Sequence, residues 1–111
     1  MSNKNDLIFI RHIMDSVEAI EEFSSDLSKK ELISNRLRQS AIVREIEVIG
    51  EAAKNLPKNF KDKHNKMAWK DITGTRDIII HRYFGVDLDV VWNIIKEDLP
   101  KLKKYLKEIE D

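Results

Sequence analysis

The sequence predicts an all-α protein: one domain, residues 1–111, folded as an antiparallel bundle of four main helices. Apolar residues recur every three or four positions along most of the chain, and no segment alternates with the period of two typical of a strand. Gly and Pro number only three and two, and 36% of residues are charged against a typical ~25%, as in small helical proteins with solvated outer faces.

The N-terminal half contains two expected helices. Residues 6–24 form the first, whose apolar stripe is Leu7, Ile10, Met14, Val17 and Ile20. Ser28 and Glu31 have the spacing of a capping box, which indicates that a second helix begins there. Its stripe runs through Ile42, Ile46, Ile49, Ala53 and Leu56, so we expect one long helix that ends at Pro57.

The C-terminal half contains a connector and two more helices. Residues 57–68 are polar and basic and are expected to connect the helices with at most a short helical turn. The third main helix begins at Trp69 and ends at Phe84–Gly85, where Gly can adopt a left-handed C-terminal cap. Asp87 is expected to cap the last helix, which extends to Ile109 with a kink at Pro100.

Composition excludes several classes of protein. The chain has no Cys, which removes disulfide scaffolds, thiolate zinc sites and iron–sulfur clusters and fits a reducing compartment, so a cytoplasmic location is expected. No apolar run approaches the about 20 residues of a spanning helix, and we expect no membrane segment or signal peptide.

Several kinds of chemistry also lack their residues. The three Gly are too far apart for a phosphate-binding loop, and none of the three His follows a Glu by three positions, as di-iron helical proteins require. We therefore expect no metal and no cofactor. Net charge is zero, yet residues 54–70 contain six Lys and one Asp, a local basic segment that can bind phosphates or simply form a solvated loop.

The segment from Gly74 to Gly85 places polar residues where a packed helix should be apolar. Arg76 shares a helical stripe with Ile79, Ile80 and Tyr83, and Asp77 and His81 are neighbours at i and i+4. The carboxylate of Asp77 can therefore orient the His81 imidazole. An Arg and a His in one cleft would make it cationic and able to transfer protons, whereas a buried Arg–Asp–His network that fixes helix packing explains the same residues without chemistry.

The angular spacing of these residues favours a dimer. His81 lies about 140° around an ideal helix from Arg76, so the two side chains converge only if the long Arg76 side chain wraps around the helix or a second chain contributes. Two such helices facing each other across a two-fold axis would place two Arg76 and two His81 side chains in one cleft.

A family resemblance rests on this segment and its surroundings. The pattern Arg76-x4-His81-x-Tyr83, followed by Phe84-Gly85-Val86-Asp87 and by the run from Val91 to Pro100, resembles the HepT family of HEPN-domain toxins. Ala41-Ile42-Val43-Arg44 and Ile49-Gly50-Glu51-Ala52-Ala53 resemble the second helix of that family. The similarity extends from about Leu7 to Leu106 and so covers almost the whole chain.

The resemblance implies a function and the residues that perform it. It implies a HEPN-like dimeric bundle that acts as a metal-independent ribonuclease, the toxin of a two-component toxin–antitoxin system. Arg76 and His81 would be the catalytic pair, with Asp77 in support, and RNA the substrate. Tyr83 would accept adenylyl groups from a cognate minimal nucleotidyltransferase antitoxin of the MntA type, which silences the toxin.

The chain departs from the family pattern at a few positions. Asp77 stands where the family often has Asn, and a carboxylate beside a phosphate-binding Arg weakens the local positive potential. Thr75 stands where Met is common, and Ala68-Trp69 replaces Pro-Trp. The rival interpretation is a non-catalytic HEPN-like helical module, for interaction or nucleotide binding, whose Arg–Asp–His set is structural.

Overall fold

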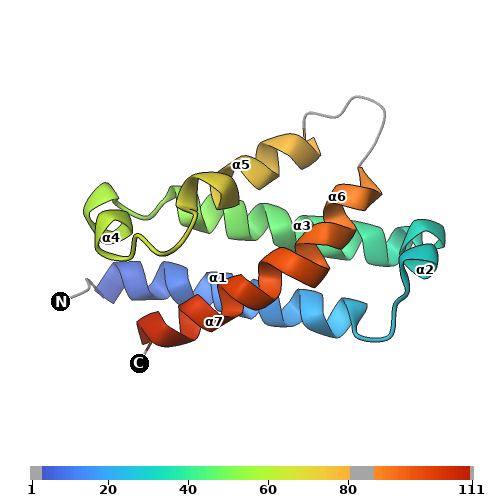
Figure 1. Cartoon of the computed structure of the whole chain (residues 1–111), viewed down its shortest axis with the longest axis horizontal. Helices are drawn as coiled ribbons and strands as arrows, with labels where there is room; N and C mark the ends of the chain where they lie inside the picture. The colour runs from blue at the N-terminus through green and yellow to red at the C-terminus, as the bar shows by residue number, and fades with distance from the viewer. Residues whose placement is uncertain (1–3, 81–86, 111) are drawn as a thin grey trace.

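A computed structural model describes residues 4–80 and 87–110, which are helical apart from short connections (Figure 1). The helices are α1 (Lys4–Ser24), α2 (Lys29–Ser34), α3 (Arg36–Lys54), α4 (Lys58–Lys63), α5 (Trp69–Ile80), α6 (Leu88–Asn93) and α7 (Leu99–Glu110), and a π-helical segment, η1 (Ile94–Asp98), joins the last two. Within these residues the all-α fold class is confirmed. The described part of the chain also contains no helix that is both long and apolar enough to cross a membrane.

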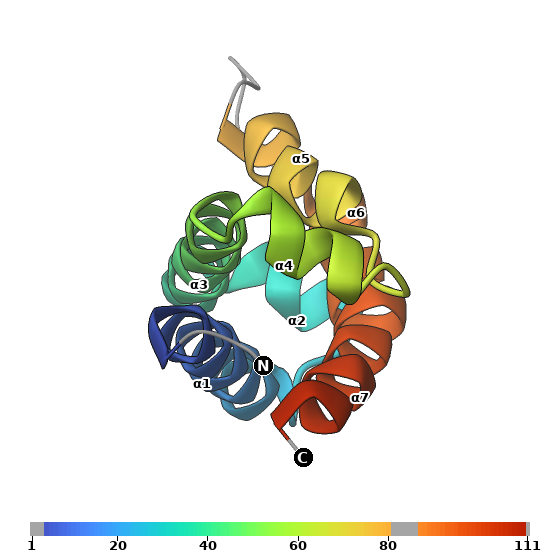
Figure 2. The ribbon, with the colours of Figure 1, turned by 90° about the vertical axis from the view of Figure 1, so that its left-hand side faces the viewer.

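The long helices run up and down. α1 and α5 point one way along the molecule, whereas α3 and the stretch from α6 to α7 point the other way, and α2 and α4 lie at the two turns (Figure 1). Seen from the end, α3 lies between α1 and α5, and α7 lies on the other side of α1 (Figure 2). The packing order is therefore α5, α3, α1, α7.

The centre of the core is the contact between α1 and α3. Side chains of α1 at a three-to-four spacing are completely buried, and so is Ile42 of α3; those of α1 are Ile10, Ile13, Val17 and Ile20. Burial of one such side chain contributes about 1.5–3 kcal/mol relative to leaving it exposed. The stripe predicted for residues 6–24 is confirmed at Ile10, Met14, Val17 and Ile20, but it is wrong at Leu7, which is 41% exposed. The prediction of the helix itself is confirmed.

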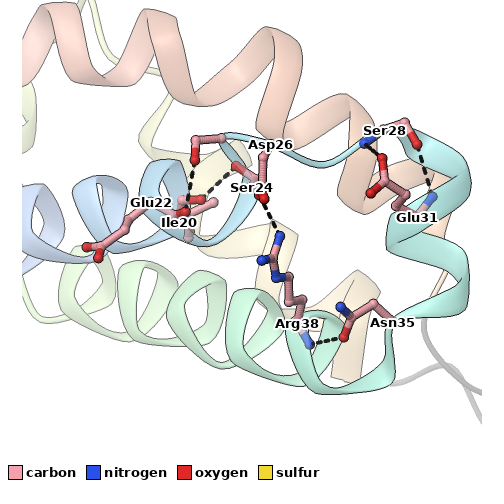
Figure 3. A network of polar contacts seen from close by, with 9 residues as sticks. Ile20, Glu22, Ser24, Asp26, Ser28, Glu31, Asn35 and Arg38 are labelled. Atoms are coloured by element: carbon pink, nitrogen blue, oxygen red, sulfur yellow. Dashed lines mark hydrogen bonds and ion pairs between the residues drawn. The ribbon is translucent and has the colours of Figure 1, made fainter.

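The expected long helix from Ser28 to Pro57 is wrong in one respect, because it is broken at Asn35. Asn35 has an extended backbone (φ −110°, ψ 90°) that ends α2, and its side-chain oxygen accepts a hydrogen bond from the Arg38 backbone N–H at 3.0 Å (Figure 3). The short amide side chain of Asn competes with helical backbone hydrogen bonds, so Asn caps a new helix more readily than it continues one. The break turns α2 away from the axis of α3.

Polar contacts hold this end of the bundle together. The predicted capping box is confirmed, since Ser28 and Glu31 exchange hydrogen bonds of 3.1 Å between side chain and backbone (Figure 3). Arg38 of α3 lies 2.6 Å from Asp26, in the connection between α1 and α2. The guanidinium holds the pKa of the Asp26 carboxyl below its ordinary value, mainly through this hydrogen bond.

The C-terminal half of the chain agrees more closely with the helices predicted from the sequence. The basic connector contains the short helix α4, α5 begins at Trp69 as predicted, and the expected end of that helix at Phe84–Gly85 lies outside the described residues. Asp87 caps α6, because its side chain accepts hydrogen bonds from the backbone N–H groups of Asp89 and Val90.

The helical ladder widens just before Pro100. The Leu99 N–H bonds to the carbonyl of Ile94, five residues earlier, in the π-helical segment η1. Pro100 has no N–H, and its ring would meet the carbonyl of Lys96 in a regular α-helix. A π-helical turn, where a kink was expected, therefore accommodates Pro100.

Candidate functional site

The start of α5 is firmly anchored. Trp69 is buried, its ring meets Phe60 of α4 edge-on at 6.2 Å between centroids, and its indole N–H donates to the His64 carbonyl at 3.0 Å. One turn later the Thr73 hydroxyl donates back to the Trp69 carbonyl. α4 and the connector therefore fix where α5 begins and which way it points.

The predicted site residues lie on α5 and beyond it. Arg76 and Asp77 belong to the described helix, with Arg76 one turn after Ile72 and Asp77 two turns after Lys70. The structure does not describe their side chains. His81 and Tyr83 lie outside the described residues. The convergence of Arg76, His81 and Tyr83 therefore stays a prediction.

A groove separates α5 from the α6–α7 stretch, and we call it the α5–α7 groove. Its volume is about 1000 Å³, and it is lined by Lys66, Met67, Ala68, Lys70, Asp71, Ile72 and Gly74 on one wall and by Asp89, Val90, Asn93, Ile94, Asp98, Lys101, Leu102 and Tyr105 on the other. It exists because α5 packs on α3, whereas α7 packs on α1. This volume is at the upper end of the range for small-molecule sites.

The floor and the rim of the groove differ in chemistry. Buried apolar side chains form the floor, among them Met67, Ile94 and Leu102, and Tyr105 is half-buried among them. The exposed rim carries charges, with Lys66 and Lys70 on the α5 side and Lys101 on the α7 side. An apolar floor with a few charged groups at its edge is the usual composition of a ligand site.

Three carboxylates share this rim with the lysines. Asp89 is 2.6 Å from Lys29, which ties α6 to α2. Partial burial raises the pKa of Asp98, with further raising by Glu97 and Asp71, although Lys101 acts in the opposite direction. The carboxylate of Asp98 is thus in an environment that disfavours its charge.

A smaller pocket of about 210 Å³ adjoins the groove and shares Tyr105, Met67 and Lys66 with it. His64 lines this pocket, and its ring centroid is 4.5 Å from that of Phe60. The Nε2 atom of His64 is buried and has no hydrogen-bond partner among the described residues. Burial, with Lys63 nearby, lowers the pKa of His64.

Sequence reasoning missed much of this groove. The basic segment 54–70 pointed to Lys66 and Lys70, but Lys101 and Tyr105 carry no signal of their own, because the groove follows from the separation of two helices. Among residues 4–80 and 87–110, no three His, Cys, Asp or Glu side chains are grouped so that they could hold a metal ion.

The sequence matches a described family over nearly its whole length. The family is "Ribonuclease HepT-like", and the match covers residues 13–109. The chain belongs to the HepT-like ribonuclease family. This match includes α5 together with Arg76, Asp77, His81 and Tyr83, so the family resemblance inferred from the motif is confirmed.

Individual relatives of the HepT-like chain have names that agree with the family. It is 40% identical over 101 residues to a "Probable ribonuclease HepT" of Thermococcus cleftensis, with 91% of this chain and 92% of the relative aligned. It is 44% identical over 102 residues to a Methanocaldococcus jannaschii protein named "Gamma-glutamylcyclotransferase and putative RNase". That alignment covers 92% of this chain but 46% of the relative, so this chain spans about half of that protein.

A solved structure shares the fold. The HEPN toxin of Shewanella oneidensis, in a tri-AMPylated state and in complex with an MNT antitoxin, aligns with a TM-score of 0.70 over 98% of both chains. Sequence identity is 17%, so this likeness concerns the fold. It agrees with the HEPN-like bundle that the sequence predicts.

Proposed function

We propose that this HepT-like protein is the toxin of a toxin–antitoxin system and cleaves RNA without a metal ion, in the cytoplasm, through the substrate's 2′-hydroxyl. Arg76 and His81 are the catalytic residues, and Asp77 supports His81. The family match over residues 13–109, which includes the Arg76-x4-His81-x-Tyr83 pattern, is the observation that carries this proposal. The position of Arg76 on α5, one turn beyond the groove residue Ile72, supports it.

His81 moves the protons in this mechanism. RNA supplies its own nucleophile, so cleavage needs a base for the 2′-hydroxyl proton and an acid for the 5′-oxygen. An imidazole has an unperturbed pKa of ~6.5, near working pH, and a positioned general base or acid contributes about 10²–10⁴-fold. Asp77, four residues before His81 on the sequence, orients the ring.

Arg76 stabilises the charge that builds on the phosphate. Its planar guanidinium stays ionised and donates two parallel hydrogen bonds to phosphate oxygens, which a lysine cannot do. The products are a 2′,3′-cyclic phosphate and a 5′-hydroxyl. DNA resists cleavage because it lacks the 2′-hydroxyl.

A homodimer completes the site in this proposal. Two His81 side chains in one cleft can act as base and acid on the same phosphate, and two Arg76 side chains can share its charge. Mixing inactive Arg76→Ala subunits with inactive His81→Ala subunits tests the sharing. Partial recovery of cleavage in the mixture supports a shared site, whereas no recovery shows that each subunit works alone.

Tyr83 is the regulatory residue of the proposal. The solved neighbour is an AMPylated HEPN toxin bound to an MNT antitoxin, and we propose the same kind of control here, by a minimal nucleotidyltransferase of the MntA type. Adenylates on the Tyr83 hydroxyl add bulk and negative charge two residues from His81, and so repel substrate phosphate. Tyr83→Phe is expected to stay toxic when the antitoxin is co-expressed. If the antitoxin fully neutralises the Tyr83→Phe toxin without modifying it, the antitoxin acts by covering the site sterically and not by modifying Tyr83.

The deciding experiment is expression of the wild type beside Arg76→Ala and His81→Ala, with growth and RNA integrity as readouts. Wild type is expected to arrest growth and degrade RNA, and each variant to lose about 10²–10⁴-fold of the cleavage rate. Arg11→Ala and His12→Ala are matched controls, because both residues are exposed on α1. Helical circular dichroism checks folding. If all five folded proteins behave alike, the Arg–Asp–His set is structural and the interaction-module interpretation replaces this one.

A further inference from the structure

The α5–α7 groove lies on the same helix, α5, as Arg76, one of the two proposed catalytic residues. Ile72 and Gly74 line its α5 wall, and Arg76 is one turn after Ile72 on the same helix. The groove is therefore in place to receive the part of a substrate that flanks the reacting phosphate.

Gly74 lines the α5 side of the groove and has no side chain, and it is the groove residue nearest to Arg76 along α5. Among the described side chains, none lies within 4 Å of a Cβ atom built on Gly74. The backbone of α5 is thus bare at this point, and a ligand can approach it closely.

Some lysines of the molecule form ion pairs, whereas among the described residues the lysines of the groove form none, and neither do others on the surface such as Lys30 and Lys107. Lys29, Lys58 and Lys103 each lie 2.6–3.0 Å from a carboxylate. In the part of the chain that the structure describes, Lys66, Lys70 and Lys101 form no such ion pair. These three ammonium groups come from both walls of one groove and are available to an anionic ligand.

The floor suits a nucleobase. Tyr105 is half-buried and lines the groove together with Lys66 and Met67, and Leu102 lies about one turn earlier on α7. Stacking of a base on an aromatic side chain contributes to single-strand binding for every base, because all bases have a π-face.

We infer that the α5–α7 groove is a subsite for single-stranded RNA, in which Lys66, Lys70 and Lys101 bind backbone phosphates and a base packs on Tyr105. This inference rests on the proposed ribonuclease function. Asp71 and Asp98, which also line the groove, oppose it electrostatically, and Asp89 does so less because it is paired with Lys29. Removal of the Asp98 charge should therefore tighten RNA binding. If the charged residues of the rim had only a structural role, this substitution would not increase the affinity for RNA.

The test is the affinity for a short fluorescein-labelled single-stranded RNA, measured by fluorescence anisotropy in a His81→Ala background that prevents cleavage. The triple variant Lys66→Gln, Lys70→Gln, Lys101→Gln is expected to bind at least about tenfold more weakly. A plot of the logarithm of the binding constant against the logarithm of the salt concentration should become less steep by about 2 for this variant. Each phosphate contact on a single strand contributes about 0.7 to that slope. The matched control changes Lys30, Lys104 and Lys107 to Gln; all three are exposed and line no part of the groove.

Two single variants sharpen the test. Asp98→Asn is expected to tighten binding several-fold, whereas the control Asp15→Asn, exposed on α1, leaves it unchanged. Gly74→Leu adds a side chain to the α5 side of the groove without a clash between Cβ and the described side chains and should weaken binding, with circular dichroism and sedimentation unchanged.

Three outcomes overturn the inference. If the two triple variants bind RNA with equal affinity, the position of the lysines does not matter and positive charge anywhere on the surface is enough for RNA binding. Unchanged or weaker binding by Asp98→Asn would show that rim charge does not set affinity. If Gly74→Leu changes the sedimentation coefficient but not RNA affinity, a second copy of the chain occupies the groove. Failure of wild type to cleave RNA removes the proposed function and is a separate readout from these affinities.

Discussion

The pair α1–α3 and the helix α5 show two different uses of an amphipathic helix. α1 and α3 bury most of their apolar residues against each other, with Ile13 and Ile42 fully inaccessible to solvent. α5 packs on α3 with one face but lines the α5–α7 groove with another, where Ile72 is half-buried and Lys70 is exposed. The first pair supplies stability, whereas α5 leaves part of its surface accessible for a ligand.

The difference also shows in how each region is held. α5 depends on its first turn, where Trp69 is fixed by Phe60 and by the His64 carbonyl. α1 and α3 are held along their length by the core, and in addition by the ion pair between Arg38 and Asp26 at one end. We expect substitutions in the two regions to separate stability from RNA binding.

The largest expected effect is on the α1–α3 core. Ile42→Ala should lower the free energy of unfolding by about 2–5 kcal/mol, because it leaves a cavity in a closed part of the core. Ile72→Ala should cost only about 1 kcal/mol, since its side chain is already partly exposed. Urea unfolding of the two variants measures the difference. Equal losses would mean that α5 is packed as tightly as the core pair.

A smaller effect of opposite sign is expected at Gly74. Gly74→Ala should raise the free energy of unfolding by about 0.5–1 kcal/mol, because Ala has the higher helix propensity and its Cβ meets no described side chain here. Thermal unfolding followed by circular dichroism measures the gain. A loss of stability would indicate that this position of α5 is already in contact with another surface.

The smallest effect concerns pH. His64 has a lowered pKa in the folded protein, mainly through burial, and its Nε2 atom lacks a partner among the described residues. The unfolded chain therefore binds a proton more readily, so stability is complete above the unfolded pKa of about 6.5 and decreases as the pH falls below it. His64→Gln should flatten the pH dependence of the melting temperature between about pH 7 and pH 5.5 relative to wild type. His12→Gln, at an exposed position of α1, is the matched control.

Short-range rules explain why much of the fold could be predicted. The α1 stripe, the Ser28–Glu31 capping box and the Asp87 cap each depend on residues within one or two turns. The break at Asn35 was missed because Asn both ends and begins a helix here, and an apolar stripe on either side of it looks continuous. The π-helical turn before Pro100 follows from backbone geometry that side-chain periodicity does not report.

The candidate site divides in the same way. The Arg76-x4-His81-x-Tyr83 pattern and the family to which it belongs are properties of the sequence, since they are defined by order and spacing along the chain. The α5–α7 groove is a property of the tertiary structure. Residues 66–74 and 89–105 face each other across it because α5 packs on α3 and α7 packs on α1. The separation between α5 and α7 cannot be predicted from any local sequence pattern. Sequence therefore determined the helices and the family, while packing alone decided which lysines share a groove with Tyr105.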